Sequence, residues 1–472
     1  MVKKLQMQKN DTGYEMREYS EKAIRQKQIP RLVLAAPHSG SGKTMITMGL
    51  LAAFQKRGIK LASYKCGPDY IDPMFHSRVL GLPTRNLDTY FTDADTTRML
   101  FAQGQTEETQ LSLIEGVMGY YDGAGLATQT GSTYELANVL EAPVVLIIDA
   151  AGMSLSAVAV LKGFLEYRES DRIAGVLFNR MSKQVYEAIR PEVEALGIRA
   201  CGYVPRLSDM ELPSRHLGLV APGELSNLRT YTEKLAERIE ETVDLDALLA
   251  LAQNAQELTW KPVTLPKLSR ALNVSVAKDE AFCFLYEDNL KYLREIGAKV
   301  QFFSPLHESK LPDGTEVLLL TGGYPELYAE KLSANTDMRQ SIRAALENGI
   351  YVLAECGGFL YLTEQLEDME GHSYPMAGWI PAKAFQTKKL SRFGYIELTP
   401  QAGGAKIRGH EFHYFDTTDN GSDFVAKKPF RDVRWECMHA SERALIGFPH
   451  LYYYSNPAFL AERLEQYIEA RG

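Results

Sequence analysis

The stretch of sequence that decides the fold is Arg31-Leu-Val-Leu-Ala-Ala-Pro-His-Ser-Gly-Ser-Gly-Lys-Thr44. Its first six residues are strand-like, and the helix-like stretch that follows ends near Lys56. A strand, a glycine-rich loop and a helix in this order are typical of a phosphate-binding P-loop, because backbone N–H groups and the helix N-terminus can hold phosphates. Pro37 replaces the first glycine of the usual motif, so the loop should begin more stiffly. The stretch still predicts a nucleotide-binding α/β domain.

Four residues of this loop have distinct expected roles. Gly40 and Gly42 let the backbone approach the phosphates. The Lys43 ammonium would neutralise the phosphates, and the Thr44 hydroxyl would hold Mg²⁺. Further along, Asn179 ends a strand-like run and could hydrogen-bond an adenine edge, although an ordinary turn residue is the alternative. We therefore expect a nucleotide and Mg²⁺ in the N-terminal half.

Acidic side chains follow two other strand-like runs, at the edge where open α/β sheets bind ligands. Asp69 and Asp72 lie three residues apart and close to Lys65, which suits Mg²⁺ coordination together with phosphate neutralisation. A polar turn explains the same residues equally well. Glu115 ends an apolar run and opens a glycine-rich segment that contains Asp122, a suitable place for a further Mg²⁺ ligand.

The second decisive motif is Val352-Leu-Ala-Glu-Cys-Gly-Gly358, an apolar run that ends in a cysteine and two glycines. A strand that turns sharply into a helix holds a side chain in a strained position, and the glycines let backbone N–H groups reach an oxyanion beside it. With His450 far downstream as general base, Cys356 is predicted to be a nucleophile. A buried structural cysteine is the alternative.

Strand-like runs alternate with helical stretches in two series, which predicts two α/β domains, the first built on a parallel sheet. The strand-like runs of the first series are 31–36, 60–65, 111–115, 144–149, 174–179 and 200–204, with helical segments at 45–57, 132–140, 155–168 and 183–196. Those of the second series are 273–277, 281–285, 298–303, 316–320 and 350–354. We expect a P-loop domain at 30–252, a Pro-containing linker at 253–272 and a C-terminal domain at 273–472.

The composition is that of an ordinary soluble protein: 472 residues, too many for one compact core, with 45% hydrophobic and 24% charged residues. The net charge of −8 argues against a nucleic-acid partner and means that a local basic patch must capture any anionic substrate. No apolar run is long enough to span a membrane, and five cysteines without a CxxC pair favour a reducing cytoplasm. Residues 1–29 are polar, and we expect an extension outside the fold, with a short exposed helix as one form.

Together these motifs resemble the glutamine-dependent cobyrinic acid a,c-diamide synthases of corrinoid biosynthesis, from Arg31 to about Arg463. The first half is also similar to dethiobiotin synthetase, and the second half to class I glutamine amidotransferases. The resemblance therefore implies an N-terminal P-loop parallel-sheet domain and a C-terminal class I glutamine amidotransferase-like domain. The segments that carry it are Ser39–Thr44, Lys65–Pro73, Arg85–Asp88, Glu115–Gly119, Gly131–Thr133, Arg215–Leu219, Ala354–Gly358 and Gly409–His413.

The resemblance implies that the C-terminal domain hydrolyses glutamine. Cys356 would attack the side-chain amide and form a glutamyl thioester, while His450 assists proton transfer. Backbone N–H groups near Gly323 and Gly357 would stabilise the oxyanion of the bound glutamine. Many class I amidotransferases have Glu two residues after this His; here it is Tyr452, so a Cys–His dyad is expected, and another group must orient the imidazole. The rival bases, expected to be structural or substrate-adjacent, are His410 and His413.

The resemblance further implies that the N-terminal domain transfers the ATP γ-phosphate to a peripheral carboxylate of the corrinoid, with ATP and Mg²⁺ as cofactors. Ammonia can then attack the acyl phosphate, and a protected path between the domains is expected. The residues expected to bind phosphate and Mg²⁺ are Lys43, Thr44, Lys65, Asp69, Asp72, Glu115 and Asp122. The expected substrate contacts are Tyr70, Ile71, Arg85, Arg215 and His216.

Three alternatives stay open at the level of sequence. A hydrogenobyrinic acid or nickel-sirohydrochlorin a,c-diamide synthase would share these motifs. A cobyric acid synthase would amidate four other carboxylates and differs in the Lys65–Pro73 region. A P-loop ATPase with a vestigial amidotransferase domain would not amidate at all, and the intact Cys356 and His450 argue against it. The expected partners are small molecules, without nucleic acid or membrane, and a homodimer is one option for the assembly.

Overall fold

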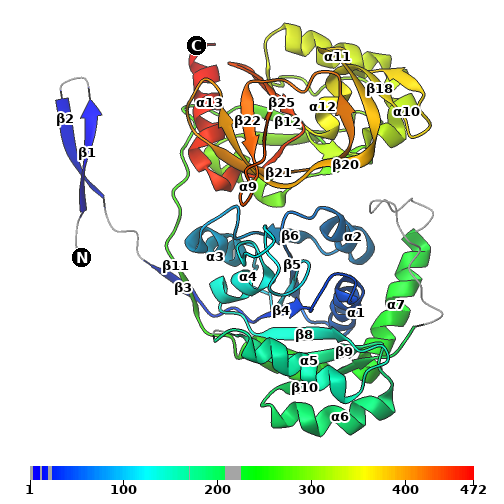
Figure 1. Ribbon diagram of the computed structural model, residues 1–472. Helices are drawn as coiled ribbons and strands as arrows, with labels where there is room; N and C mark the ends of the chain where they lie inside the picture. The colour runs from blue at the N-terminus through cyan, green and yellow to red at the C-terminus, as the bar shows by residue number, and fades with distance from the viewer. Residues whose placement is uncertain (1–3, 11–12, 20–23, 170, 208–224, 472) are drawn as a thin grey trace.

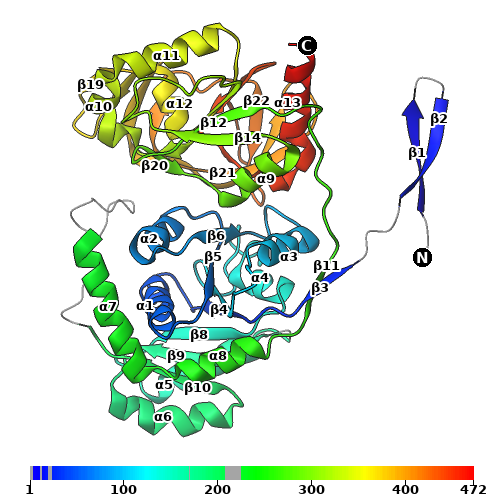
Figure 2. The ribbon, with the colours of Figure 1, turned by 180° about the vertical axis from the view of Figure 1, so that it is seen from behind.

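The computed structural model describes residues 4–10, 13–19, 24–169, 171–207 and 225–471. Figure 1 shows two α/β bodies stacked on one another, and Figure 2 shows the same arrangement from behind. One body contains the P-loop and the other contains the cysteine motif, and a single extended segment along one side joins them. The two-domain α/β organisation predicted from the sequence is confirmed. Within the described residues, no helix combines the length and the apolar character needed to cross a membrane.

The N-terminal domain has the strands β4 (Arg31–Ala35), β5 (Leu61–Cys66), β6 (Thr84–Leu87), β7 (Leu111–Glu115), β8 (Val144–Asp149), β9 (Ile173–Asn179) and β10 (Arg199–Val204). They form a seven-stranded parallel sheet in the order β10-β9-β8-β4-β7-β5-β6. Along β4, Val33 and Ala35 enter one hydrophobic core, and Leu32 and Leu34 enter another on the opposite face. The sheet is therefore buried on both faces, which explains why most of its strands read as continuous apolar runs.

Helices cover both faces of this sheet. The core that contains Leu32 also receives residues of α1 (Lys43–Lys56), α2 (Ile71–Leu80), α7 (Leu225–Thr242) and α8 (Leu245–Gln253). The core that contains Val33 receives residues of α3 (Ala94–Gln103), α4 (Thr133–Val139), α5 (Leu155–Glu166) and α6 (Lys183–Ala195). Because the strands are parallel, the loops after β4, β5, β7 and β9 gather at one edge of the sheet, where ligands bind in such folds.

The ends of this domain are tied together. Strand β3 (Arg25–Lys27) pairs antiparallel with β11 (Leu258–Trp260), so parts of the predicted extension and of the predicted linker pair with each other. Earlier in the chain, β1 (Lys4–Asn10) and β2 (Gly13–Tyr19) form an antiparallel hairpin that lies apart from both bodies (Figure 1). The expectation of a short exposed helix in this extension is therefore wrong.

The C-terminal domain contains two larger sheets. The first consists of β14 (Lys299–Phe303), β12 (Asn273–Ala277), β15 (Val317–Leu320), β17 (Tyr351–Glu355), β25 (Ala444–Gly447) and β24 (His439–Ser441), in this spatial order and parallel except for β24. The second consists of β19 (Ser373–Pro375), β18 (Thr363–Glu367), β20 (Ile380–Pro400), β21 (Ile407–Thr417) and β26 (His450–Leu451), with β22 (Phe424–Lys427) paired to β20 and β23 (Arg434–Cys437) paired to β22. A short pair is formed by β13 (Phe282–Phe284) and β16 (Gly322–Gly323).

The helices of this domain are α9 (Glu287–Ile296), α10 (Ala329–Ala334), α11 (Thr336–Glu347), α12 (Gly357–Leu362) and α13 (Pro457–Glu469), with short 3₁₀ turns at Pro325–Tyr328 and Tyr453–Ser455. The predicted strands of the second series are confirmed to within a residue or so at each end. The second sheet was not anticipated, because its long strands mix polar and apolar residues without a clean alternation.

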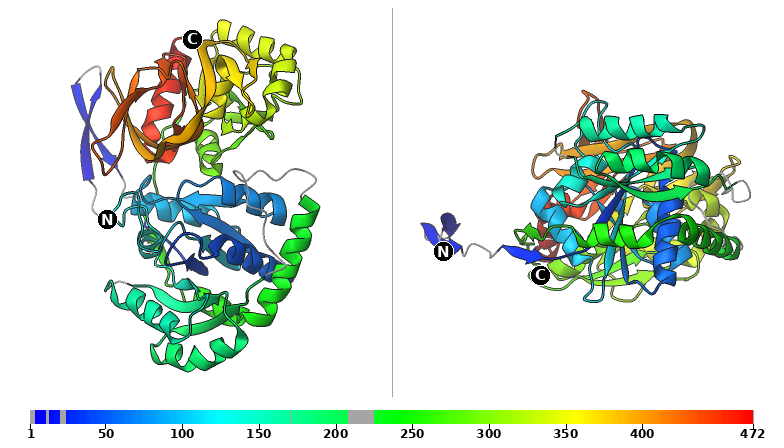
Figure 3. Two further views of the ribbon diagram at one scale, coloured as in Figure 1. Left: turned by 45° about the vertical axis from the view of Figure 1, so that its right-hand side comes forward. Right: turned by 90° about the horizontal axis from the view of Figure 1, so that it is seen from below.

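Figure 3 shows the two domains stacked on one another. Side-chain contacts join them directly. The Tyr395 hydroxyl donates to Asp88 Oδ2 at 2.7 Å, and Arg408 donates to the Tyr90 carbonyl oxygen at 2.6 Å. The rings of Phe91 and Tyr452 stack with their centroids 5.0 Å apart. An ion pair between Arg85 and Asp288 also crosses the interface. The orientation of the domains is therefore set by specific polar and aromatic contacts and does not depend on the connecting segment alone.

Arg31 begins β4 and is fully buried, where its guanidinium donates to backbone carbonyls, the shortest being that of Leu140 at 2.6 Å. Replacing Arg31 with Met should lower the free energy of unfolding of this domain by about 2–4 kcal/mol, because four carbonyls lose their buried donor. The matched control Arg57→Met removes only surface ion pairs and should cost about 0–1 kcal/mol. Calorimetric unfolding of both variants measures the difference, and equal losses would contradict this account of Arg31.

Candidate active site

Cys356 lies at a sharp turn between strand β17 and helix α12. Its φ of 48° and ψ of −105° put a residue that carries a Cβ in a strained region of backbone space. The Cys356 N–H donates to the Gly447 carbonyl at 2.8 Å, which fixes the turn to strand β25. A methyl group on Gly358 would lie 2.2 Å from the Leu320 carbonyl oxygen, so only glycine fits there. The structure thus contains the strand–turn–helix that the sequence predicts, and the nucleophilic role of the sulfur stays a prediction.

The same sheets bring His450 next to this turn. Strand β25 pairs with β17, and the chain continues from Gly447 to His450, which pairs with His410 across β26 and β21. The His450 ring is buried, and neither of its nitrogens has a hydrogen-bond partner among the described residues. Burial, and then the neighbouring His410 and His413, lower the pKa of His450 well below its usual value. The imidazole is therefore neutral, the form that can accept a proton.

Glu355, directly before the cysteine, is an acidic side chain beside His450. Its Oε2 lies 3.8 Å from His450 Nδ1, and its Oε1 accepts a hydrogen bond from the Leu451 N–H at 3.3 Å. Burial raises the pKa of Glu355 to about 8. Tyr452 carries no carboxylate that could contact the His450 ring, and its hydroxyl donates to Asp288 Oδ2 at 3.2 Å. Glu355 thus lies beside the His450 ring without a hydrogen bond to it, and we propose it for the role of orienting the ring, which the sequence leaves without a candidate.

The backbones of Gly323 and Gly357 meet beside the cysteine. A methyl group on Gly357 would lie 3.0 Å from the Gly323 nitrogen. This close approach suits an oxyanion site made of backbone N–H groups, which stays the predicted role of both residues. Burial, and then the charge of Glu326, raise the pKa of the Cys356 thiol above its usual value. The resting sulfur is therefore protonated and needs a base to become a nucleophile.

The P-loop forms a second site at the edge of the N-terminal sheet. Both predicted loop glycines adopt a positive φ, 82° at Gly40 and 91° at Gly42. Asn179 Nδ2 donates to the Ser41 carbonyl at 2.9 Å, and a methyl group on Gly42 would lie 2.3 Å from that nitrogen. Asn179 therefore supports the loop backbone, and its predicted contact with adenine stays a prediction.

A buried cluster of charged groups lies beside the P-loop. Thr44 Oγ1 donates to Glu115 Oε1 at 2.6 Å, and Lys65 Nζ donates to the same oxygen at 2.9 Å and to Asp72 Oδ2 at 2.5 Å. Asp69 Oδ2 lies 3.9 Å from the same ammonium. Burial alone would lower the pKa of Lys65, but the carboxylates of Glu115, Asp72 and Asp69 outweigh it and raise the pKa. The fold thus brings these five predicted residues into one place.

Lys43, the P-loop lysine, donates to the Met118 carbonyl at 2.5 Å. Burial, and then the charge of Lys65, lower the pKa of Lys43 to about 8. A buried ammonium group with a lowered pKa is costly to keep charged, so bound phosphate would stabilise the charged form of Lys43. Burial also raises the pKa of Asp69 to about 6, with Asp72 adding to the effect.

The donor set near Thr44 fits Mg²⁺, which prefers carboxylate and hydroxyl oxygens. Glu115 Oε2 is buried and has no hydrogen-bond partner within the described residues, and His76 Nε2 lies 3.5 Å from it. In the part of the chain that is described, no three His, Cys, Asp or Glu side chains already surround one metal position. Because Mg²⁺ usually binds through one or two carboxylates, waters and substrate phosphates, the cluster suits an ion that arrives with a nucleotide.

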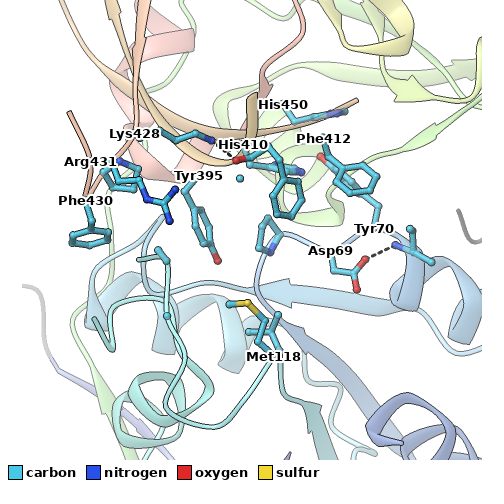
Figure 4. Close-up of a pocket in the computed structure, with 18 of the residues that line it drawn as sticks. Asp69, Tyr70, Met118, Tyr395, His410, Phe412, Lys428, Phe430, Arg431 and His450 are labelled. Atoms are coloured by element: carbon cyan, nitrogen blue, oxygen red, sulfur yellow. Dashed lines mark hydrogen bonds between the residues drawn. The ribbon is translucent and has the colours of Figure 1, made fainter. Parts of the chain in front are cut away.

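A cavity of about 520 Å³ lies between the two domains. Figure 4 shows residues of both domains that line this cavity. The N-terminal domain contributes Asp69, Tyr70 and Ile71 to its lining, and the C-terminal domain contributes His410 and His450. The predicted metal ligand and the predicted general base therefore face one common space.

Tyr70 is the side chain that joins the two halves of this space. Its ring stacks on Phe284 and Tyr286 of the C-terminal domain, with centroid distances of 5.0 and 4.5 Å. The same ring lies 5.3 Å from that of His450. Tyr70, predicted from the sequence as a substrate contact, is thus also a contact between the domains, directly after Asp69 in the chain.

Two of the remaining predicted residues can be placed: Arg85 lies outside the cavity lining, and Asp122 lies close enough to the P-loop that its charge opposes the lowering of the Lys43 pKa. Arg85 forms the ion pair with Asp288 and does not line the cavity, so its role as a substrate contact has no geometric support. Asp122 Oδ2 accepts a hydrogen bond from the Gly119 N–H at 3.2 Å, within its own loop. Arg215, like His216, falls outside the described residues.

Several residues near these sites were missed from the sequence. His76 is one turn after Asp72 on α2, and this spacing could have indicated it. Glu355 could have been noticed as the neighbour of Cys356. Lys428 and the aromatic residues around it follow β22 without a recognisable motif, so no local signal marks them as cavity residues.

Comparison with known proteins agrees with this geometry. Residues 32–220 match the family model of the CobQ/CobB/MinD/ParA nucleotide binding domain, and residues 273–440 match that of the CobB/CobQ-like glutamine amidotransferase domain. The fold and its two sites thus define a P-loop nucleotide-binding domain joined to a glutamine amidotransferase domain.

Similarity to individual proteins identifies the family within this class. The chain is 38% identical over 442 residues to the cobyrinate a,c-diamide synthase of Listeria monocytogenes serotype 4b, covering 90% of this chain and 97% of the relative. It is 37% identical over 455 residues to the cobyrinate a,c-diamide synthase of Thermoplasma volcanium, covering 93% and 98%. The same protein of Dehalococcoides mccartyi strain CBDB1 is 37% identical, covering 91% and 96%. The chain belongs to the cobyrinate a,c-diamide synthase family.

The strain at Cys356 predicts an unusual order of stability. Cys356→Gly should make the C-terminal domain more stable than Cys356→Ala by about 1 kcal/mol, because glycine adopts the positive φ without a Cβ penalty. Both variants lack the sulfur, so the comparison isolates the backbone. Chemical unfolding of the two proteins measures it, and an alanine variant more stable than the glycine variant would rule out strain at this turn.

Proposed function

We propose that this protein catalyses the ATP- and glutamine-dependent amidation of the a and c side-chain carboxylates of cobyrinate. We infer the substrate from the relatives, which are named cobyrinate a,c-diamide synthases. The observation that carries the proposal is the single cavity shared by Asp69 and His450. An enzyme that releases ammonia at one site and consumes it at another benefits when groups of both sites border one cavity.

Glutamine hydrolysis begins with proton transfer from the Cys356 sulfur to His450. The sulfur then attacks the side-chain amide carbon, and backbone N–H groups of Gly323 and Gly357 stabilise the oxyanion. The C–N bond breaks as His450 returns the proton to the leaving nitrogen, which releases ammonia and leaves a glutamyl thioester. Water, deprotonated by His450, then hydrolyses the thioester to glutamate and regenerates the thiol. Glu355 orients the His450 ring through these steps.

The N-terminal domain uses ATP to activate the carboxylate of the macrocycle. Lys43 and Lys65 neutralise the phosphate oxygens, and the glycines of the P-loop let its backbone N–H groups bind them. Mg²⁺, held by Thr44 and the acids near it, would supply further neutralisation of phosphate charge. Transfer of the γ-phosphate to the carboxylate gives an acyl phosphate and ADP. Ammonia then attacks the acyl carbon, and phosphate leaves as the amide forms.

The side chains of His450, Asp69 and Tyr70 all line this cavity, so ammonia released beside His450 has a short route to Asp69 and Tyr70. Ammonia that mixed with water at neutral pH would be protonated and lost as a nucleophile, so a short route through the cavity would conserve it. We place the reaction in the cytoplasm, on small-molecule substrates and without a nucleic-acid or membrane partner. The homodimer stays a prediction.

Mass spectrometry on protein given ATP, Mg²⁺, glutamine and cobyrinate should show two successive amidations of one macrocycle. Cobyrinate should be preferred over hydrogenobyrinic acid and nickel-sirohydrochlorin in parallel reactions. Cys356→Ala should lower the glutamine-dependent rate by at least about 10³-fold, because no other group replaces the sulfur nucleophile. Ammonium chloride at alkaline pH should restore amidation, since the N-terminal site is intact.

The matched control is Cys437→Ala, which removes another buried thiol away from the cavity and should keep the glutamine-dependent activity. Hydrolysis of glutamine by Cys356→Ala would overturn the nucleophile assignment. Hydrolysis of glutamine by the wild type without amidation of any macrocycle would leave the C-terminal assignment standing and remove the proposed substrate.

A further inference from the structure

The proposed substrate carries several peripheral carboxylates, whereas the chain has a net charge of −8. Overall attraction therefore cannot bring the two together, and a local group of cations must do so. Arg85 is the cation that the sequence indicates for this role, but its charge is already matched by Asp288 at the domain interface. The Lys65 ammonium is likewise surrounded by acids. The cations that bind the macrocycle must lie elsewhere.

Two cations line the cavity from the C-terminal domain: Lys428 and Arg431, in the segment between β22 and β23 (Figure 4). Lys428 Nζ donates to the backbone carbonyls of Arg392, at 3.2 Å, and of Phe393. Within the described residues, neither Lys428 nor Arg431 forms an ion pair with a carboxylate. Their positive charges are therefore available to an anionic ligand.

Burial lowers the pKa of Lys428 to about 8, with Glu411 opposing this effect and Arg431 adding to it. The ammonium is still charged at neutral pH but is partly removed from water. A carboxylate placed next to it would stabilise the charged form, and a pair in this partly dry setting is worth more than one at an exposed surface.

The rest of the cavity wall suits a flat apolar ring. Phe393 and Phe430 are 57% and 47% exposed, unusually high for phenylalanine, and Met118 on the opposite wall is 39% exposed. Phe412 packs against Phe393 with a centroid distance of 5.4 Å. Large apolar side chains that gather at a cavity and stay exposed are typical of a surface that a ligand covers.

We propose that Lys428 and Arg431 determine specificity by binding peripheral carboxylates of a flat polycarboxylate macrocycle whose ring packs on Phe412 and Phe430. The inference rests on the proposed function and adds that the two walls of the cavity bind different carboxylates of the substrate. The C-terminal wall holds carboxylates that do not react, and the opposite wall presents the reacting carboxylate to Asp69 and the P-loop.

The test measures the steady-state kinetics of cobyrinate amidation at saturating ATP and glutamine. Lys428→Met and Arg431→Met should each raise the KM for cobyrinate about 10- to 100-fold, the loss expected for one charge-assisted contact, with a much smaller change in kcat. Lys428→Arg should restore most of the affinity. The matched controls Lys427→Met and Arg434→Met remove the same charge from neighbouring positions outside the cavity lining and should leave the KM unchanged.

A KM within twofold of the wild type in both cavity variants would overturn the inference, as would an equal rise in the two controls. Because Arg431 is exposed, Arg431→Met tests the inference even where Lys428→Met fails to fold. A wild-type protein that amidates none of the macrocycles would instead remove the proposed function, so the two failures are distinguishable.

Discussion

The insertion of Tyr70 between the domains is the interaction on which the rest of the arrangement depends. Its ring comes from the loop that holds Asp69 and packs among Phe284, Tyr286 and His450 of the other domain. This contact adds to the Tyr395–Asp88 hydrogen bond and the Arg85–Asp288 ion pair that also join the domains, and it lies in the lining of the cavity. The loop after β5 and the start of β26 border one cavity, and the Tyr70 ring from that loop lies beside the His450 ring.

Charge is distributed unevenly around this cavity. The N-terminal side concentrates acids and ammonium groups that offset one another, as the contacts of Lys65 show. The C-terminal side has Lys428 and Arg431 without carboxylate partners in the described part of the chain. Around Cys356 and His450 burial dominates, so that the thiol and the imidazole are both uncharged at rest. The three regions thus suit three different steps, namely phosphate transfer, carboxylate binding and proton transfer.

Much of this structure follows from the sequence. The apolar runs of the parallel sheet, the P-loop and the turn at Cys356 are set by local patterns, and the structure contains them where they were predicted. What could not be predicted depends on contacts between distant segments. The polar edge strand β6 and the mixed strands β20 and β21 have no clear periodicity. The ion pair of Arg85 depends on Asp288, which is distant in the sequence and belongs to the other domain. Lys428 can be recognised as a candidate binding residue only from the cavity that it lines.

The central claim is that ammonia passes between the two sites through the cavity that both domains line, and an isotope competition tests it most directly. The protein would be given cobyrinate, ATP and glutamine labelled with ¹⁵N in its side-chain amide, together with a large excess of unlabelled ammonium, and the isotope content of the product amides would be measured by mass spectrometry. The account predicts that the new amides contain almost only ¹⁵N, because ammonia passes through the cavity before it can mix with the solution. Amides that carry mainly ¹⁴N would show that ammonia escapes to solvent between the two sites, which would contradict the shared cavity.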